Sequence, residues 1–148
     1  MKVLILVWGA SNRGKSQGIK QLAMSFPFKS IIQSWHDDDY DSYVIGTYND
    51  EEGNERIVGI ESQGDPGYSQ LDWIEACVNG NCDVIVAACR TYGSTYNDAA
   101  SVAHNNGYEI IEVTTPFHEG GDPVLANGLD LRESFASNIR NLILDCLK

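Results

Sequence analysis

Residues 2 to 16 read Lys-Val-Leu-Ile-Leu-Val-Trp-Gly-Ala-Ser-Asn-Arg-Gly-Lys-Ser, and this stretch decides the fold. Residues 2 to 8 form an almost unbroken apolar run with β-branched members, which is typical of a strand buried on both faces of a sheet. Gly9 and Gly14 bound the segment that follows. Apolar residues then recur at helical spacing from Ile19 to Phe26. The stretch therefore predicts a strand, a glycine-bounded loop and a helix, in that order.

The loop has the composition of a phosphate-binding segment. A triphosphate needs backbone N–H groups that converge on its oxygens, and Gly9 and Gly14 allow the close approach that a side chain would block. The helix that begins near Gly14 points its positive end at the phosphates. In this spacing Lys15 reaches the β- and γ-phosphates, and the hydroxyl of Ser16 is a Mg2+ ligand.

The pattern Gly9-x4-Gly14-Lys15-Ser16 resembles the Walker A motif of the P-loop NTPase superfamily, and the resemblance is specific over residues 2 to 26. It implies that the chain binds a nucleoside triphosphate together with Mg2+. Lys15 is the implied catalytic residue of the loop, and Arg13 is a candidate for stabilising charge on the phosphates. The implied cofactor-binding residues are Gly9, Ala10, Ser11, Asn12, Arg13, Gly14, Lys15, Ser16 and Gln17.

Length and composition restrict the class of protein. A chain of 148 residues with 43% hydrophobic residues predicts one folded domain over residues 1–148. Its 10 basic and 21 acidic residues give a formal net charge of −11, the opposite of what nucleic acid or an anionic membrane attracts. No stretch approaches the roughly 18 apolar residues of a membrane span. The four cysteines lack the His/Cys partners of a zinc site, which favours reduced thiols in a cytoplasmic protein.

Strand and helix patterns alternate along most of the chain. Strand-like runs cover about residues 2–8, 30–33, 43–48, 56–62, 83–89 and 108–114, and helical patterns cover about 15–26, 69–79, 96–106 and 130–146. The polar joint between the third and fourth runs predicts a β-hairpin at about 43–62. Gly107 is a candidate C-cap, and Asp130 with Glu133 has capping-box spacing. The alternation predicts an α/β three-layer sandwich with a mainly parallel sheet.

A second acidic group is expected at the tip of a neighbouring buried strand, to hold Mg2+ through water or to activate the attacking water. The best candidate is Glu61, which closes the apolar run 56–60. With Gly64, it forms a Glu-x-x-Gly segment similar to the Asp-x-x-Gly segment after the central hairpin of GTPases and related switch proteins. The resemblance implies a catalytic and metal-binding role for Glu61, a γ-phosphate contact for Gly64 and a water-orienting role for Gln63. The alternative is an ordinary strand-end carboxylate.

Other charged residues were weighed for the same role. The run Asp37-Asp38-Asp39 beside His36 is typical of a solvated loop, or alternatively forms a switch or substrate-binding segment over the nucleotide. Asp83 begins its strand, and ligands bind at the opposite, carboxyl ends of parallel strands. Asp83 is therefore not expected in the site.

Two further segments are expected on the ligand side of the sheet. Arg90 follows the carboxyl end of the 83–89 strand, where it either pairs with a phosphate as a catalytic residue or is a surface arginine. The loop 115–123 follows the next strand, and Pro116 or Phe117 can pack on a purine there or serve as local packing anchors.

Residues 88–92 read Ala-Cys-Arg-Thr-Tyr, where GTPases of similar arrangement carry an Asn-Lys-x-Asp motif, so ATP is favoured over GTP. The resulting interpretation is a P-loop protein that hydrolyses ATP or switches a partner on binding it. The alternative is a small kinase that passes the γ-phosphate to a small molecule such as a nucleoside or nucleotide. With five arginines and no arginine-bearing lid, an uncharged acceptor is favoured for that kinase. A third possibility is a nucleotide-binding subunit without turnover.

Overall fold

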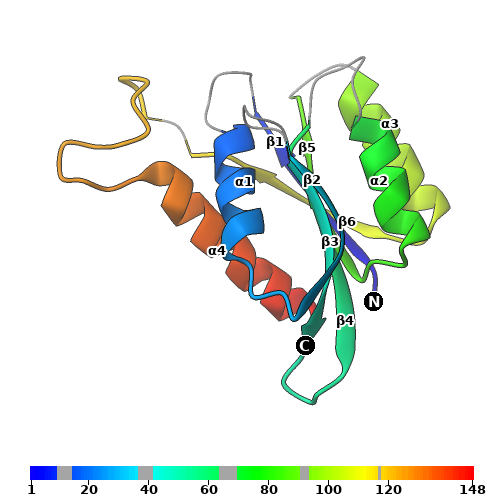
Figure 1. The fold of residues 1–148 in the computed structure, drawn as a ribbon. Coiled ribbons are helices and arrows are strands. Elements are labelled where there is room, and N and C mark those ends of the chain that lie inside the picture. The colour runs from blue at the N-terminus through cyan, green and yellow to red at the C-terminus, as the bar shows by residue number, and fades with distance from the viewer. Residues whose placement is uncertain (10–14, 37–41, 64–69, 91–93, 117) are drawn as a thin grey trace.

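The computed structural model describes residues 1–9, 15–36, 42–63, 70–90, 94–116 and 118–148, and it describes Lys15 and Ser16 by their backbone alone. The elements are β1 (Val3–Trp8), α1 (Lys15–Ser25), β2 (Ser30–His36), β3 (Ser42–Asn49), β4 (Glu55–Glu61), α2 (Gln70–Asn79), β5 (Val84–Cys89), α3 (Ser94–Asn105), β6 (Glu109–Thr114) and α4 (Leu131–Cys146). The predicted α/β class is therefore confirmed (Figure 1).

The described strands form one sheet in the order β2-β3-β4-β5-β1-β6. Its centre is parallel: Val3 of β1 pairs with Val84 of β5 on one side and with Glu109 of β6 on the other. β4 is parallel to β5, whereas β3 is antiparallel to both β4 and β2. The predicted hairpin is confirmed, since Tyr43 of β3 pairs with Glu61 of β4. The sheet is thus parallel on one side and antiparallel on the other.

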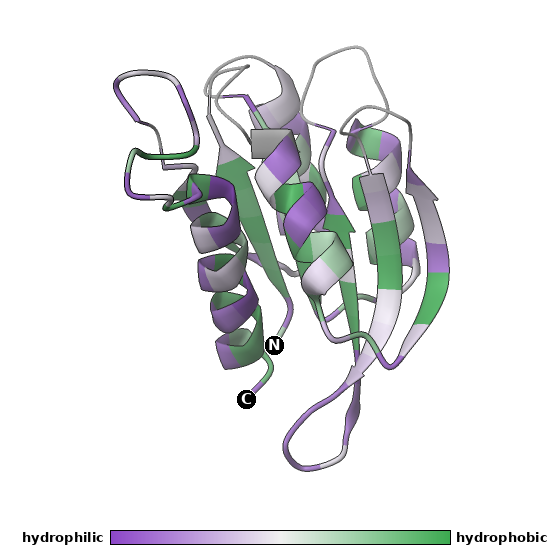
Figure 2. Cartoon of the chain, turned by 60° about the vertical axis from the view of Figure 1, so that its left-hand side comes forward, coloured by the Kyte–Doolittle hydropathy of each residue, from purple (hydrophilic) through white to green (hydrophobic). Residues whose placement is uncertain are grey.

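Two apolar layers cover the faces of the sheet. The side chain of Ile5 in β1 belongs to the layer with α1 and α4, and that of its neighbour Leu6 belongs to the layer with α2 and α3. Residues 3–7 of β1 are fully buried, as the apolar run predicted. Figure 1 shows the same two helix pairs on opposite sides of the sheet. In Figure 2 the central strands are hydrophobic, while the loop of the β3–β4 hairpin is hydrophilic.

Local capping explains where two helices begin and end. Gly107 follows α3 with a positive φ of 77°, and the Tyr108 N–H donates to the Ala103 carbonyl oxygen at 2.9 Å. This is a Schellman cap, so the role predicted for Gly107 is confirmed. At the start of α4, the Arg132 N–H donates to the side chain of Asp130 at 2.9 Å. Asp130 is therefore the predicted N-cap.

The four cysteines are free thiols, and Cys77, Cys82 and Cys89 are buried. Cys77 and Cys82 meet because α2 also ends in a Schellman cap. Asn81 has a φ of 59°, and the Cys82 N–H donates to the Cys77 carbonyl oxygen at 3.1 Å. In this cap the residues at the two ends of the hydrogen bond often touch through apolar side chains. The Cys-x4-Cys spacing is thus a helix-capping feature.

Two expectations need correction. β2 extends to His36, three residues beyond the predicted strand, because it continues pairing with β3 as far as Ser42. The strand that ends in Glu61 was expected beside β1, but β5 lies between them. The cause is the connection through α2, which returns the chain from β4 to the adjacent, parallel position nearer to β1.

Candidate functional site

The carboxyl ends of β4, β5, β1 and β6 meet at one edge of the sheet, and α1 begins at the same edge (Figure 1). The chain leaves β1 for α1 on one face of the sheet, and it leaves β5 for α3 on the other face. Adjacent strands with connections to opposite faces form a crevice, where open α/β sheets bind ligands. The candidate site is therefore centred on the ends of β1 and β5.

The predicted phosphate-binding loop starts at this crevice. β1 ends at Trp8 and α1 begins at Lys15, so strand, loop and helix follow the predicted order. Gly9 lies against the segment that leaves β6, because a Cβ added to it would be 2.9 Å from Thr115 Oγ1. The rest of the loop lies outside the described residues, which leaves the predicted contacts of Ala10, Ser11, Asn12, Arg13, Gly14, Lys15 and Ser16 as predictions.

A chain of hydrogen bonds joins β4, β5, α2 and α3 at the same edge. The Ala88 N–H donates to Glu61 Oε1 at 2.8 Å. The side-chain amide of Gln70 donates to the carbonyl oxygens of Ala88 and Thr95, at 2.7 and 3.1 Å. The Arg90 N–H donates to Thr95 Oγ1 at 3.1 Å. These bonds fix the main chain that carries Arg90 away from β5, so Arg90 lies at the carboxyl ends of the parallel strands, as predicted.

Glu61 is fully buried, with 0% of its surface exposed. Its carboxylate replaces a main-chain acceptor for Ala88, because the regular pairing of β4 with β5 ends at Ile60 and Val86. Two strand spacings, about 10 Å, separate β4 from β1. Among the described residues, no cluster of three or more His, Cys, Asp or Glu side chains is suited to a metal ion. The structure thus gives Glu61 a positioning contact, and its role as a Mg2+ ligand stays a prediction.

Gln63 extends the chain beyond β4 at the same edge. Its neighbour Ser62 is fully buried and closes the open end of the β3–β4 hairpin. The Ser62 N–H donates to the Ser42 carbonyl oxygen at 3.0 Å, and the Ser42 N–H donates to Ser62 Oγ at 2.7 Å. Gln63 is itself 8% exposed. Gly64, predicted to contact the γ-phosphate, lies outside the described residues, so that contact stays a prediction.

Gln17, in the first turn of α1, is held by the start of α4. A guanidinium N–H of Arg132 donates to Gln17 Oε1 at 2.7 Å, and another donates to Asp130 Oδ2 at 2.9 Å. The hydrogen bond with Arg132 lowers the pKa of Asp130, and the same bond raises the pKa of Arg132. The side-chain oxygen of Gln17 therefore supports the packing of α1 against α4, beside the predicted loop.

The remaining predicted site residues divide between described and undescribed segments. Pro116 is exposed and follows Thr115, so it leaves β6 on the side of the sheet where Gly9 lies. Phe117 and the acidic run 37–39 lie outside the described residues. Asp83 lies at the opposite end of β5, where its carboxylate accepts from the Ile57 N–H at 2.9 Å, which agrees with its exclusion from the site.

Four residues that build this edge were missed in the sequence: Gln70, Thr95, Thr115 and Arg132. Gln70 and Thr95 are polar residues in the first turn of a helix, where such residues are ordinary. The hydrogen bond between Gln70 and Thr95 depends on the placement of α2 and α3 beside the end of β5, and that placement could not be predicted from the sequence. Arg132 follows the predicted N-cap Asp130 by two residues, and this pair of opposite charges could have indicated an ion pair at the start of the helix.

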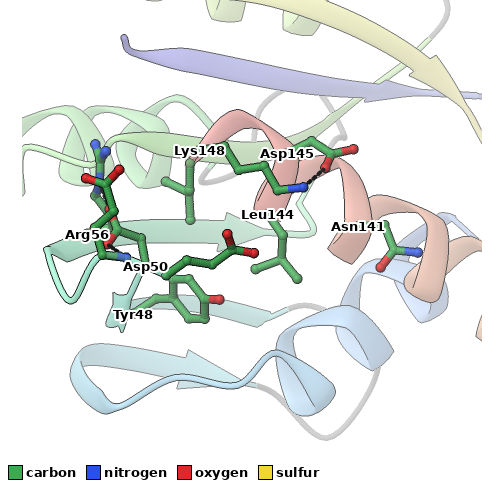
Figure 3. A pocket seen from close by; sticks show the side chains of 10 residues that line it. Tyr48, Asp50, Arg56, Asn141, Leu144, Asp145 and Lys148 are labelled. Carbon is green, nitrogen blue, oxygen red and sulfur yellow. Dashed lines mark hydrogen bonds and ion pairs between the residues drawn. The ribbon is translucent and has the colours of Figure 1, made fainter.

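A separate cavity of about 540 Å³ lies at the opposite end of the molecule, between the β3–β4 hairpin and the end of α4. Figure 3 shows Tyr48 and Asp50 on the hairpin side and Leu144 on the helix side. Asp50 is paired there with Arg56 at 3.1 Å. The cavity is lined by residues at the amino end of the parallel strands, so it is not part of the candidate site.

Comparison of the chain with protein-family models, curated proteins and solved structures finds no match. In the described part of the chain, no helix combines the length and the apolar character needed to cross a membrane.

Proposed function

We propose that this protein binds ATP with Mg2+ through Gly9–Ser16. One observation carries the proposal: this sequence connects the carboxyl end of a fully buried central strand, β1, to the amino end of α1, at the crevice between β1 and β5. A helix amino terminus favours anions through its exposed N–H groups and its dipole. The strand, the glycine-bounded loop and the 11-residue helix thus supply the surroundings in which Gly-x4-Gly-Lys-Ser binds phosphate.

The donor set of the loop fits a Mg2+-bound triphosphate. In this proposal Lys15 neutralises the β- and γ-phosphates, the main-chain N–H groups of 10–14 surround them, and the Ser16 hydroxyl holds Mg2+. The metal would supply charge neutralisation on the phosphate oxygens. The close approach of Gly9 to Thr115 supports placing the base toward Pro116 and Phe117, on the β6 side of the loop.

Hydrolysis of ATP, or switching on its binding, is the function we propose for the bound triphosphate. Arg90 would stabilise charge on the phosphates from the end of β5, and Gln63 would orient the attacking water beyond β4. Glu61 would position both Gln63 and Arg90. This role is supported by its hydrogen bond with Ala88, because that bond links β4, which precedes Gln63, to β5, which precedes Arg90. A direct contact of Glu61 with Mg2+ remains part of the proposal.

The test is calorimetric titration of the full chain with ATP, with and without Mg2+, for the natural sequence and Lys15→Ala. Loss of a charge-assisted contact should weaken ATP binding about 10- to 100-fold. Lys2→Ala is the matched control, since Lys2 lies at the other end of β1 and bonds Asn81 at 2.6 Å. Equal ATP affinity in Lys15→Ala and the natural protein, or no ATP binding at all, overturns the proposal.

Turnover is tested separately by following phosphate release from ATP. Release in the absence of any acceptor supports hydrolysis, whereas ATP consumption that requires an added nucleoside or alcohol supports the kinase alternative. Gln63→Ala should slow release without weakening ATP binding. An unchanged rate of phosphate release in Gln63→Ala would show that Gln63 is not a catalytic residue.

A further inference from the structure

β2 is one of the two edge strands of the described sheet, and all seven of its residues are exposed. Ile31, Ile32 and Trp35 are 52%, 58% and 50% exposed. An edge strand offers a row of N–H and C=O groups to another strand, and natural proteins commonly protect such edges with charged residues. Between Ser30 and His36, however, the strand has no Lys, Arg, Asp or Glu.

The apolar surface continues from β2 onto α1. Met24 is 78% exposed, and a cavity of about 420 Å³ beside the strand is lined by Met24, Trp35 and Val44, among others. Four of the seven exposed large hydrophobic residues in the described part of the chain lie on β2 or near the end of α1: Met24, Ile31, Ile32 and Trp35. Met24 is on the α1 side of the sheet, and Trp35 packs against Trp73 on the α2 side, so the edge is apolar on both faces. Apolar residues gathered along one edge of a sheet, unlike scattered apolar residues, indicate an interaction surface.

Trp35 is held in a fixed position on this surface. Its ring lies 5.3 Å from that of Trp73 in α2, and the Trp73 ring lies 5.6 Å from that of Tyr43. A half-exposed aromatic side chain that is already ordered loses little entropy on binding, and such residues are frequent hot spots of interfaces. Ile32 falls at a register shift between Ile31 and Gln33, so a partner can cover its side chain without disturbing β3.

The charges that flank β2 indicate which partner fits. Lys29 comes just before the strand, and Asp37-Asp38-Asp39 comes just after it. When a second copy of the strand lies antiparallel, Lys29 of each copy lies nearest the His36 end of the other, and the acidic run follows His36 directly in the sequence. The neutral interior meets a neutral interior, which matters because each chain carries a net charge of −11. The edge is therefore complementary to itself.

We propose that β2 is a self-association edge, at which two copies of this chain pair antiparallel about a two-fold axis. Such an interface is isologous, with the same surface used by both copies. Pairing would join the two sheets into one and cover Ile31, Ile32, Trp35 and Met24 on both copies. A contact made by one strand and a few side chains is small, so we expect dissociation constants in the micromolar range, about 1 to 100 µM.

The test is sedimentation velocity of the full chain between about 1 and 200 µM, a range that spans the expected constant. The natural protein should shift from monomer to dimer. Ile32→Lys places a charge on each copy at an exposed position and should weaken the dimer by about tenfold or more. Leu129→Lys is the matched control, because Leu129 is 43% exposed and lies far from β2, before α4. The control should dimerise normally.

Charge complementarity gives a second, independent variant. Lys29→Glu makes both ends of the strand acidic and should also weaken the dimer, more at low salt than at high salt. A natural protein that stays monomeric over the whole range overturns the proposal. So does a dimer that survives Ile32→Lys and Lys29→Glu unchanged, since its interface must then lie elsewhere. Circular dichroism of each variant verifies that the monomer remains folded.

Discussion

Gly59 of β4 lies against the buried sulfur atoms of Cys77 and Cys82. A Cβ added to Gly59 would be 2.5 Å from Cys77 Sγ and 3.1 Å from Cys82 Sγ. A hydrogen bond with Cys82 and burial raise the pKa of Cys77, so this thiol is protonated at neutral pH. The glycine is therefore required by the cap of α2, which brings the two cysteines together over the sheet.

Replacement of this glycine tests the contact. Gly59→Ala should lower the free energy of unfolding by about 1–3 kcal/mol, because the added methyl overlaps a sulfur atom in a packed core. Urea denaturation measures the change. Gly59→Ala should lower the unfolding free energy less in a Cys77→Ala background than in the natural protein, since removal of Sγ creates room for the methyl. Strictly additive effects would contradict the proposed overlap.

Gln70 holds together the hydrogen bonds at the carboxyl ends of the parallel strands, because it donates to both Ala88 and Thr95. Gln70→Leu keeps the approximate size but leaves the carbonyl oxygens of Ala88 and Thr95 without this donor. We expect a loss of about 1–3 kcal/mol in unfolding free energy, the usual cost of an unsatisfied buried polar group. Gln21→Leu, a half-buried position on α1, is the control and should change stability little. Equal effects of the two substitutions would argue against a special role for Gln70.

At the scale of elements, the start of α4 links three features: its N-cap Asp130, Arg132, and Gln17 of α1. Asp130 and Arg132 are partly buried, with side chains 16% and 27% exposed. The contact therefore ties the two helices that cover one face of the sheet. Close packing of the same helices at Gly18, where a Cβ would be 2.7 Å from Phe135 Cδ1, acts in the same direction.

The ion pair predicts a specific pH dependence. Because the folded protein lowers the pKa of Asp130, chiefly through its hydrogen bond with Arg132, the carboxylate stabilises the fold above its ordinary value of 3.8. That stability is lost as the pH falls through the lowered folded value. Asp130→Asn keeps a good N-cap but removes the charge, and should cost up to about 1 kcal/mol at neutral pH. Unfolding free energies between pH 2 and 7 should differ least at the acid end, and a constant difference would contradict this assignment.

Local elements of this fold were predictable, whereas their lateral order was not. The loop between β1 and α1, the β3–β4 hairpin, the cap at Gly107 and the cap at Asp130 all follow from residues close together in sequence. The insertion of β5 between β1 and β4 depends on which strands pair across long separations. Burial of Glu61 follows from that insertion, because the carboxylate bonds to Ala88 of β5. Asn81 was missed as a cap since asparagine adopts positive φ less often than glycine.

At the scale of the whole molecule, charge is the dominant surface property. The chain has a calculated isoelectric point near 4.4 and a formal net charge of −11 at pH 7. Like charges on a compact surface repel one another and favour the unfolded state. Exposed ion pairs, such as Lys29 with Glu55 at 3.9 Å, offset little of this repulsion.

Salt should therefore stabilise this protein at neutral pH. Raising the NaCl concentration from about 20 to 500 mM should increase the melting temperature by roughly 2–5 °C, because screening weakens the repulsion. Scanning calorimetry measures the shift. The control is the same comparison near pH 4.4, where the net charge vanishes and the increase should disappear. An increase of equal size at both pH values would show that screening of charge repulsion is not the cause.

The strand order also determines when the proposed phosphate site can form during synthesis. β2, β3 and β4 pair with near neighbours in the chain, but Val3 of β1 pairs only with Val84 and Glu109. More than half of the chain must therefore leave the ribosome before the strand that carries the glycine loop has a partner. Contacts between distant residues form late and leave apolar segments exposed in the meantime. On a nascent chain, β1 is thus a segment for chaperones to protect, and the proposed nucleotide site is the last part of the protein to form.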